Sequence, residues 1–176
     1  ATFFVTNQFP AYQHLIADEF NSGHTVAVHT YSHNYNVYSS VDSYINDFNQ
    51  MNEIIKNYTG SYSTQFRFPG GSSNTISRSY SIGVVRQIAD EMTRRGYIYY
   101  DWNVDSTDAA GSWTDAVYNS VINGTNNCTS CVVLMHDIKQ PTAEALDRII
   151  TTLKQRGYTF ERLTPGSPTS HHGINN

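Results

Sequence analysis

The chain has 176 residues, of which 39% are hydrophobic and 15% are charged, and its formal net charge at pH 7 is -4. This composition is typical of one globular domain with a sizeable core and excludes a disordered chain. The negative charge and the lack of any Lys/Arg run argue against nucleic acid as a partner, and no apolar run approaches the roughly 20 residues of a membrane span.

Short apolar runs alternate with helical patterns along the first half of the chain. ATFFVT at residues 1–6 predicts a strand, and a helix is expected from about Ala11 to Ser22. TVAV at residues 25–28 predicts the second strand. Apolar residues at spacings of three and four from Val41 to Tyr58 predict a long amphipathic helix that ends at Gly60.

The second half of the chain continues this alternation of strands and helices. The remaining predicted elements are a strand FRF (66–68), a helix over 84–92 stopped by Gly96, a strand YIYYDWNV (97–104), a weaker helix over 114–122, a strand CVVLM (131–135), a helix opened by Pro141, and a last strand YTFERL (158–163). Six strands in alternation with helices predict a parallel sheet with right-handed crossovers. A (β/α) barrel and an open doubly wound sheet both fit this order, and no glycine-rich phosphate loop supports a nucleotide-binding sheet.

Titratable residues follow four of the predicted strands. They are His29 and His33 after TVAV, Arg67 in FRF, Asp105 and Asp108 after YIYYDWNV, and His136 after CVVLM. Each residue alone has an ordinary explanation, such as an ion pair, a turn cap or a histidine in the core. Four groups at the carboxyl ends of parallel strands are harder to explain in this way, because that rim carries the chemistry in such folds.

Five motifs occur in the order ATFFVT, GHTVAVHTYSH, FRFPGG, WNVDSTD and VVLMHD. Together they closely resemble the polysaccharide deacetylases of carbohydrate esterase family 4, which share the nodulation chitooligosaccharide deacetylase homology domain. The resemblance is greatest to peptidoglycan N-acetylglucosamine deacetylases of Gram-positive bacteria. It implies an α/β fold, a distorted, incomplete (β/α) barrel with parallel strands, over residues 1–163, with a tail at residues 164–176.

One family motif is missing from the chain. TFDDG carries the catalytic base and a metal ligand in this family, and no Asp-Asp pair occurs in the sequence. We expect the motif, with the first strand–helix unit, to lie ahead of Ala1. Without that unit, ATFFVT would form an unpaired sheet edge, so the alternative to an upstream segment is an edge-strand dimer with a second copy.

The resemblance also implies a metal and an oxyanion site. His29 and His33 would bind a divalent ion, most often zinc, with cobalt or another ion as alternatives. Arg67 would hold the catalytic aspartate. The N–H of Gly70 would bind the oxyanion, although the family often has Tyr at this position.

The later motifs imply the proton donor and the groove. His136 would be the general acid, tuned by Asp108 as the first choice and Asp105 as the second. Ala109 stands where the family commonly has Trp, and Trp102 is expected to compensate in part. The remaining substrate-binding candidates are Leu134, which would line the acetyl pocket, Tyr31 and Pro69.

The implied function is hydrolysis of N-acetyl groups from a cell-wall or chitin-like polysaccharide by an exported, extracellular or cell-wall enzyme. O-deacetylation of xylan-like polymers uses the same groups and stays open. So do a carbohydrate-binding protein without catalysis, with sugar on Tyr31, Tyr35 or Trp102, and an iron oxygenase with two histidines and a carboxylate. Cys128 and Cys131 form either a short-loop disulfide or two free thiols.

Overall fold

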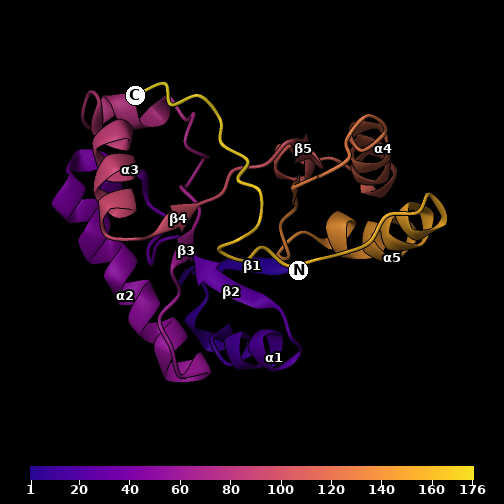
Figure 1. Ribbon diagram of the computed structural model, residues 1–176, viewed down its shortest axis with the longest axis horizontal. Coiled ribbons are helices and arrows are strands. Elements are labelled where there is room, and N and C mark those ends of the chain that lie inside the picture. Colours follow the sequence, from indigo (N-terminus) through magenta and orange to yellow (C-terminus); the bar gives the residue numbers. More distant parts are fainter. The chain divides into compact units, whose positions relative to one another are not determined.

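A computed structural model describes residues 1–176 and divides them into two compact units. The first unit is Ala1–Asp101 with Arg162–Asn176, and the second is Trp102–Glu161. The first unit holds β1 to β4 with α1 to α3, and the second holds β5, β6, α4 and α5 (Figure 1). Every strand pair is parallel.

The first unit is a four-stranded parallel sheet in the order β1-β2-β3-β4. Its elements are β1 (Thr2–Val5), α1 (Leu15–Asn21), β2 (Thr25–Val28), α2 (Val41–Thr59), β3 (Gln65–Phe66), α3 (Val84–Arg94) and β4 (Ile98–Tyr99). In the register of the sheet, Thr2 lies opposite Thr25 and Val28 lies opposite Phe66. The strand order follows the chain order, which is the usual result when sequential strands lie next to one another.

Helix α2 forms because its sequence combines a cap, an apolar face and a stop. The Ser40 side chain accepts a hydrogen bond from the Ser43 N–H at its start, and Gly60 ends it with φ 82°. Tyr44 and Phe48 are fully buried on its inner face and pack on Phe66 of β3. Burial of these large side chains fixes the helix against the sheet.

The second unit is a parallel pair of strands with two helices. Its elements are β5 (Val104–Asp105), α4 (Thr114–Gly124), β6 (Val133–Leu134) and α5 (Gln140–Gln155). Helices α4 and α5 pack side by side (Figure 1) through a small core that includes Val117, Val121, Ile149 and Leu153. Pro141 lies in the first turn of α5, where its missing N–H costs nothing.

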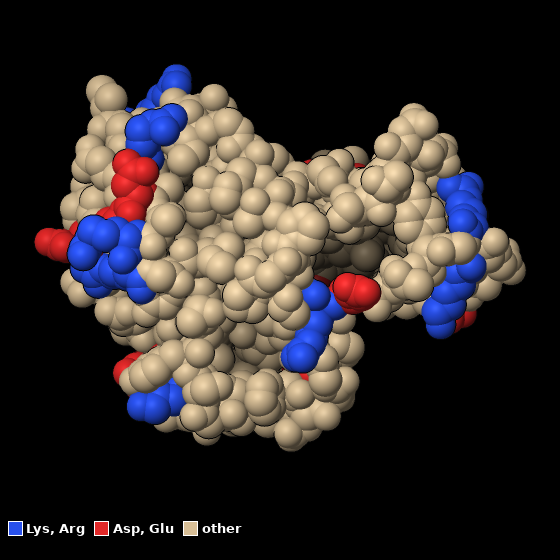
Figure 2. Space-filling model, viewed as in Figure 1, with Lys and Arg blue, Asp and Glu red and all other residues tan.

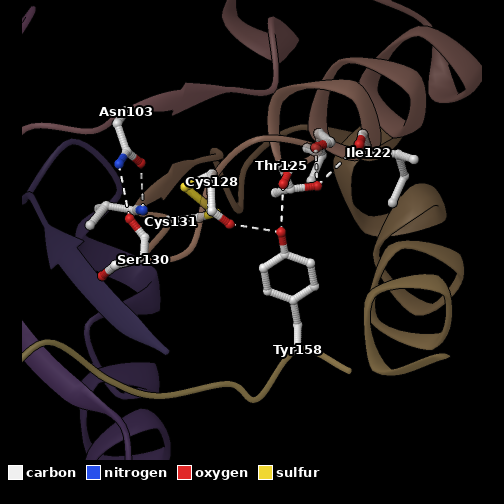
Figure 3. The surroundings of a disulfide bond; sticks show 9 residues. Asn103, Ile122, Thr125, Cys128, Ser130, Cys131 and Tyr158 are labelled. Carbon is white, nitrogen blue, oxygen red and sulfur yellow. Dashed lines mark hydrogen bonds between the residues drawn. A yellow bond between two sulfur atoms is a disulfide. The ribbon is translucent and has the colours of Figure 1, made fainter. Parts of the chain in front are cut away.

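A disulfide joins Cys128 and Cys131 in the loop between α4 and β6 (Figure 3), which decides between the two alternatives for these cysteines. The Tyr158 hydroxyl lies 2.7 Å from the Cys128 carbonyl oxygen and 2.5 Å from that of Thr125. The Asn103 amide donates to the Ser130 carbonyl at 3.0 Å. The loop is therefore held both covalently and by its neighbours.

The structure confirms the parallel α/β fold class, and sheets of four and two short strands are consistent with an incomplete barrel. Helices α2 to α5 lie where their apolar spacing predicts them. None of the five helices is both long and apolar enough to cross a membrane. The tail over 164–176 contains no helix or strand, but its Asn176 carbonyl accepts from the Arg86 N–H at 2.9 Å.

Several predicted element bounds are wrong. Residues 158–163 form no strand, because the Leu163 main chain bonds to the Thr2 and Thr25 hydroxyl groups instead of a strand ladder. YIYYDWNV is not one strand, since it divides into β4 and β5, which belong to different sheets. The strand in FRF starts one residue earlier and ends at Phe66, and α1 starts at Leu15 after a 3-10 turn opened by Pro10.

Candidate active site

The HTYSH segment is a loop that follows β2, so the spacing of its two histidines is not that of a helix face. Thr30 and His33 have positive φ angles of 68° and 49°. Non-glycine residues rarely adopt this conformation, and such residues concentrate at functional sites. The loop brings the His29 and His33 rings to a centroid distance of 4.8 Å.

Asp47 of α2 holds the middle of this loop. Its Oδ1 accepts from the N–H of Tyr31 at 2.6 Å and from that of Ser32 at 3.2 Å, and its Oδ2 also lies 3.2 Å from the Ser32 nitrogen. The sequence reasoning missed Asp47. A signal was available, because Asp47 stands three residues after Tyr44 and four before Met51, on the apolar face of the helix.

His29 has the hydrogen-bond arrangement expected of a metal ligand. Its Nδ1 lies 2.9 Å from the Arg67 carbonyl oxygen, and with Nδ1 donating, the lone pair is on Nε2. Imidazole nitrogens are among the ligands that zinc binds, and two imidazoles lie next to each other here. No group of three or more His, Cys, Asp or Glu residues is placed to hold a metal ion, and the role of His29 and His33 as metal ligands stays a prediction.

Arg67 is buried just after β3, in an environment of carbonyl oxygens and one aromatic ring. Its Nε donates to the Tyr100 carbonyl at 2.8 Å and its Nη2 to the Asp101 carbonyl at 3.0 Å. The guanidinium carbon lies 4.2 Å from the centre of the Phe4 ring. Burial lowers the pKa of Arg67 to about 10, against the opposing effect of the Asp101 carboxylate, so the side chain stays cationic at neutral pH.

Asp101 is a second residue that the sequence reasoning gave no role in the site. Its buried carboxylate accepts from the Ser72 N–H at 2.8 Å, the Ser72 hydroxyl at 2.5 Å and the His172 N–H at 2.9 Å. These bonds fix the turn that follows Arg67. His171 stacks on Tyr99 at a centroid distance of 3.8 Å, and His172 Nδ1 lies 3.1 Å from the Ser73 hydroxyl oxygen.

Gly70 lies in that turn with φ 74°, and a Cβ atom there would come within 2.8 Å of the Tyr35 hydroxyl oxygen. A larger residue would be strained both by the backbone angle and by this contact. A Tyr at this position, as the family often carries, would therefore need the strained backbone angle and a shift of the Tyr35 side chain. Pro69 is buried beside Gly70, and its carbonyl accepts from the Tyr38 hydroxyl at 2.8 Å.

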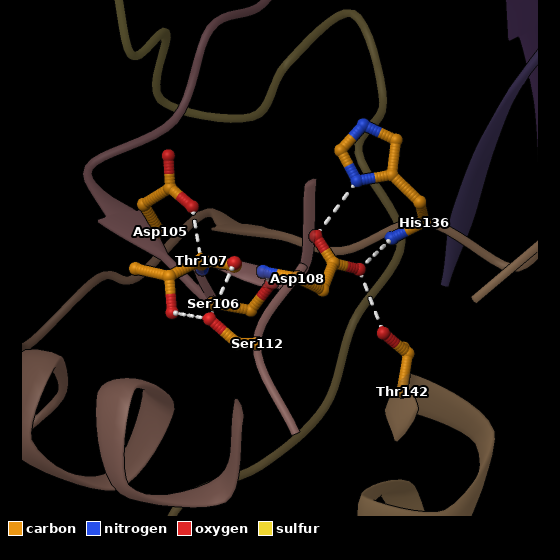
Figure 4. Close-up of polar contacts among 7 residues, drawn as sticks. All are labelled: Asp105, Ser106, Thr107, Asp108, Ser112, His136 and Thr142. Carbon is orange, nitrogen blue, oxygen red and sulfur yellow. Dashed lines mark hydrogen bonds and ion pairs between the residues drawn. The ribbon is translucent and has the colours of Figure 1, made fainter. Parts of the chain in front are cut away.

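The second unit places a histidine on a buried carboxylate (Figure 4). Asp108 Oδ1 lies 2.8 Å from His136 Nδ1, and Asp108 Oδ2 accepts from the His136 N–H at 2.7 Å. The Thr142 hydroxyl of α5 donates to Oδ2 at 2.7 Å. Thr142 was not foreseen from the sequence. The Asp108 side chain is 0% exposed and that of His136 is 34% exposed, so solvent reaches only the imidazole.

The carboxylate form of Asp108 is strongly favoured. Burial raises the pKa of this carboxyl group, but hydrogen bonds from His136 and Thr142 outweigh it and hold the pKa well below its ordinary value. Asp105 is exposed, and its Oδ1 accepts from the Thr107 N–H at 2.7 Å in the turn after β5. The contact to His136 is therefore made by Asp108, the first of the two candidates.

The remaining candidates have less distinctive surroundings. Leu134 in β6 and Trp102 are half-buried in the second unit, and Tyr31 is half-buried against the core of the first. His29, His33, Arg67 and Gly70 belong to the first unit, while Asp108 and His136 belong to the second. That all of them line one pocket stays a prediction.

Comparison with known proteins shows what this arrangement is similar to. Residues 1–83 match the family model "Polysaccharide deacetylase". The crystal structure of the catalytic domain of a peptidoglycan N-acetylglucosamine deacetylase from Eubacterium rectale matches the whole chain and 81% of its own length, with 48% identity and a TM-score of 0.98. The chain belongs to the polysaccharide deacetylase family.

More distant members of the family agree. A polysaccharide deacetylase from Bacillus cereus has a TM-score of 0.80 and 26% identity over the whole chain and 84% of its own length. Peptidoglycan-N-acetylglucosamine deacetylase PgdA of Listeria monocytogenes is 30% identical over 91% of this chain, which spans 31% of that protein. The chain thus spans about a third of this curated relative.

Proposed function

We propose that this family member hydrolyses N-acetyl groups of N-acetylglucosamine residues in a cell-wall or chitin-like polysaccharide and releases acetate. The pairing of His136 with the buried Asp108 carries the proposal, because it provides an imidazole built to donate a proton to a leaving amine. The support from similarity is that relatives named peptidoglycan N-acetylglucosamine deacetylases match nearly the whole chain.

Each residue has a distinct part in the proposed reaction. Asp108 fixes the orientation of the imidazole through Nδ1, and His136 protonates the departing amine nitrogen. The Gly70 N–H would donate to the oxygen on which negative charge develops. Arg67 stays charged and orients its neighbours. Leu134, Trp102, Tyr31 and Pro69 are the proposed contacts to the sugar and its acetyl group.

His29 and His33 would hold a divalent ion, most often zinc in this family, with cobalt as an alternative. Such an ion would supply the polarisation of the acetyl carbonyl and of the attacking water. The support from this structure is the hydrogen bond from His29 Nδ1 to the Arg67 carbonyl, which sets the ring for coordination through Nε2.

A glycan partner and an exported location complete the proposal. On the face shown in Figure 2, charged side chains form small separate groups, and uncharged residues cover most of the surface. Such a surface suits a polymer rich in hydroxyl and amide groups. The disulfide between Cys128 and Cys131 suits an oxidising compartment. Strand β1 lies at the edge of its sheet, where a second copy could pair.

The test compares two histidine variants of the protein. We expect His136→Ala to lower acetate release from chitooligosaccharides and peptidoglycan by about 10²- to 10⁴-fold, the usual contribution of a general acid, and to retain the metal. His29→Ala should lose both metal and activity, and His14→Ala, at an exposed position, is the control.

Three results would decide against parts of this proposal. Equal metal loss in His136→Ala and His29→Ala would show that the roles are wrongly divided. Binding of glycan without acetate release by the unsubstituted protein would indicate a carbohydrate-binding protein. Faster release of acetate from acetylated xylan than from N-acetylated substrates would indicate an O-acetyl esterase.

A further inference from the structure

We propose that Asp47 is a positioning residue for the metal site: its carboxylate holds the HTYSH loop in the one conformation in which His29 and His33 face the same ion. The inference rests on the proposed function insofar as that function assigns the ion to these histidines. Asp47 lies on α2 and outside the five family-like motifs of the sequence.

The first step is where the bonds fall. The two N–H groups that Asp47 accepts from belong to Tyr31 and Ser32, which stand between the two histidines. One carboxylate therefore accepts hydrogen bonds from two consecutive N–H groups in the segment between the two candidate metal ligands. A charged acceptor makes these bonds roughly twice as strong as a neutral one would.

The second step is the cost of the loop conformation. Thr30 and His33 flank these two N–H donors and have φ angles of 68° and 49°. Each such residue costs of order 1–2 kcal/mol relative to right-handed backbone, and such costs persist only when the surroundings over-determine the conformation. The bonds from Asp47 contribute to that constraint, alongside the Asn7 N–H, which donates to the Tyr31 carbonyl at 2.9 Å.

The third step is what Asp47 itself is attached to. It lies between Tyr44 and Phe48 along α2, and both of those side chains are fully buried against the sheet. The carboxylate is thus fixed to the core and not to a mobile surface. His29 is held in turn by the Arg67 carbonyl, so the first ligand is oriented through its ring and the second through the loop.

The experiment uses three variants of the 176-residue chain. Asp47→Ala removes the acceptor, and Asp47→Asn keeps the shape without the charge. Asp42→Ala is the matched control, because Asp42 is an exposed acid on the same helix that makes no bond to the loop. The measurements are Zn²⁺ affinity by calorimetric titration, amide hydrogen exchange at Tyr31 and Ser32, and thermal unfolding without metal.

We expect Asp47→Ala to lower Zn²⁺ affinity by about 10- to 100-fold, the usual effect of removing a group that orients a metal ligand. Asp47→Asn should lower the Zn²⁺ affinity by a smaller factor. The Zn²⁺ affinity of Asp42→Ala should stay within about 2-fold of that of the unsubstituted chain. Amide exchange at Tyr31 and Ser32 should accelerate in Asp47→Ala alone. Similar melting temperatures for Asp47→Ala and Asp42→Ala would assign the affinity difference to the loop and not to general destabilisation.

Equal Zn²⁺ affinity in Asp47→Ala and Asp42→Ala would overturn the inference. If Asp47→Ala does not fold, Asp47→Asn decides by the same comparison. If the unsubstituted chain binds too little Zn²⁺ to titrate, as two ligands without a third would explain, the exchange measurement decides the role of Asp47, and the metal assignment is tested separately by His29→Ala. Unchanged exchange at Tyr31 and Ser32 would then refute the role of Asp47.

Discussion

Asp108 shows how a single residue can be fixed for one task. Its two carboxylate oxygens receive hydrogen bonds from the His136 ring, the His136 main chain and the Thr142 hydroxyl. A buried carboxylate with several donors is stabilised in its charged form despite the cost of leaving water. The same bonds that orient His136 therefore couple the stability of the second unit to pH.

The sign of this coupling follows from the lowered pKa of Asp108 in the folded state. When the pH falls below about 4, the unfolded chain takes up the proton first, so the unfolded state is stabilised relative to the folded state. The stabilisation from Asp108 is thus fully present above that pH and is lost as the pH falls toward the folded-state pKa. We expect a loss on the order of 2 kcal/mol.

The measurement is chemical denaturation of the chain at intervals from pH 6 to pH 2. Asp108→Asn should be less stable at pH 6 and should lose less stability on acidification than the unsubstituted chain. Asp105→Asn is the control, because Asp105 is exposed and does not contact His136. Equal pH dependence of the two variants would contradict the assignment to Asp108.

At the scale of elements, the last residue of α4 is a glycine that leaves little space for a side chain. A Cβ atom on Gly124, the last residue of the helix, would lie 2.6 Å from Val104 Cγ1 of β5. A contact this short requires the Val104 side chain, the strand or the helix end to shift. The glycine therefore sets how closely α4 approaches the sheet of the second unit.

Gly124→Ala should accordingly destabilise the second unit by about 1–3 kcal/mol, the usual cost of overpacking a well-packed contact. Asn123→Ala, one residue earlier and exposed, should change stability by less than about 0.5 kcal/mol. Chemical denaturation followed by tyrosine and tryptophan fluorescence measures both. A Gly124→Ala chain as stable as Asn123→Ala would show that Val104 moves aside without cost.

The elements also show which features a sequence can reveal. Helices α2 to α5 were predictable because apolar residues every three or four positions mark one buried face, and Gly60, Gly96 and Pro141 mark ends. Strands of two residues were not, since their bounds depend on pairing with distant segments. The sequence pattern therefore predicts YIYYDWNV as one strand, although the segment divides into β4 and β5.

The same reason explains what was missed in the site. His29, His33 and His136 stand in motifs, so a resemblance could point to them. Asp47 and Thr142 stand outside the motifs and act on residues 15 or more positions away. Periodicity can show that Asp47 lies on a buried face, but it cannot show which main-chain groups its carboxylate meets.

At the scale of the whole molecule, each of the two units holds part of the proposed set of site residues. The two imidazoles of the first unit and the carboxylate–histidine pair of the second are both formed. No cluster of three or more potential ligands accompanies them, and the sequence has no Asp-Asp pair. A zinc ion at a catalytic site takes three protein ligands and one open position.

We therefore expect the 176-residue chain to bind Zn²⁺ weakly and to release acetate slowly. The reason is that each missing ligand removes a coordinate bond, and the base that would accept the water proton is not identifiable in the sequence. The comparison is a matched chain that carries a TFDDG segment ahead of Ala1, titrated with Zn²⁺ and assayed on chitooligosaccharides under the same conditions. The longer chain should bind Zn²⁺ more tightly and turn over faster, while His29→Ala should abolish both gains.

Tight Zn²⁺ binding and full turnover by the 176-residue chain would mean that the third ligand and the base lie among its own carboxylates. Asp101, which is buried within hydrogen-bonding reach of Ser72, would then be the first residue to substitute.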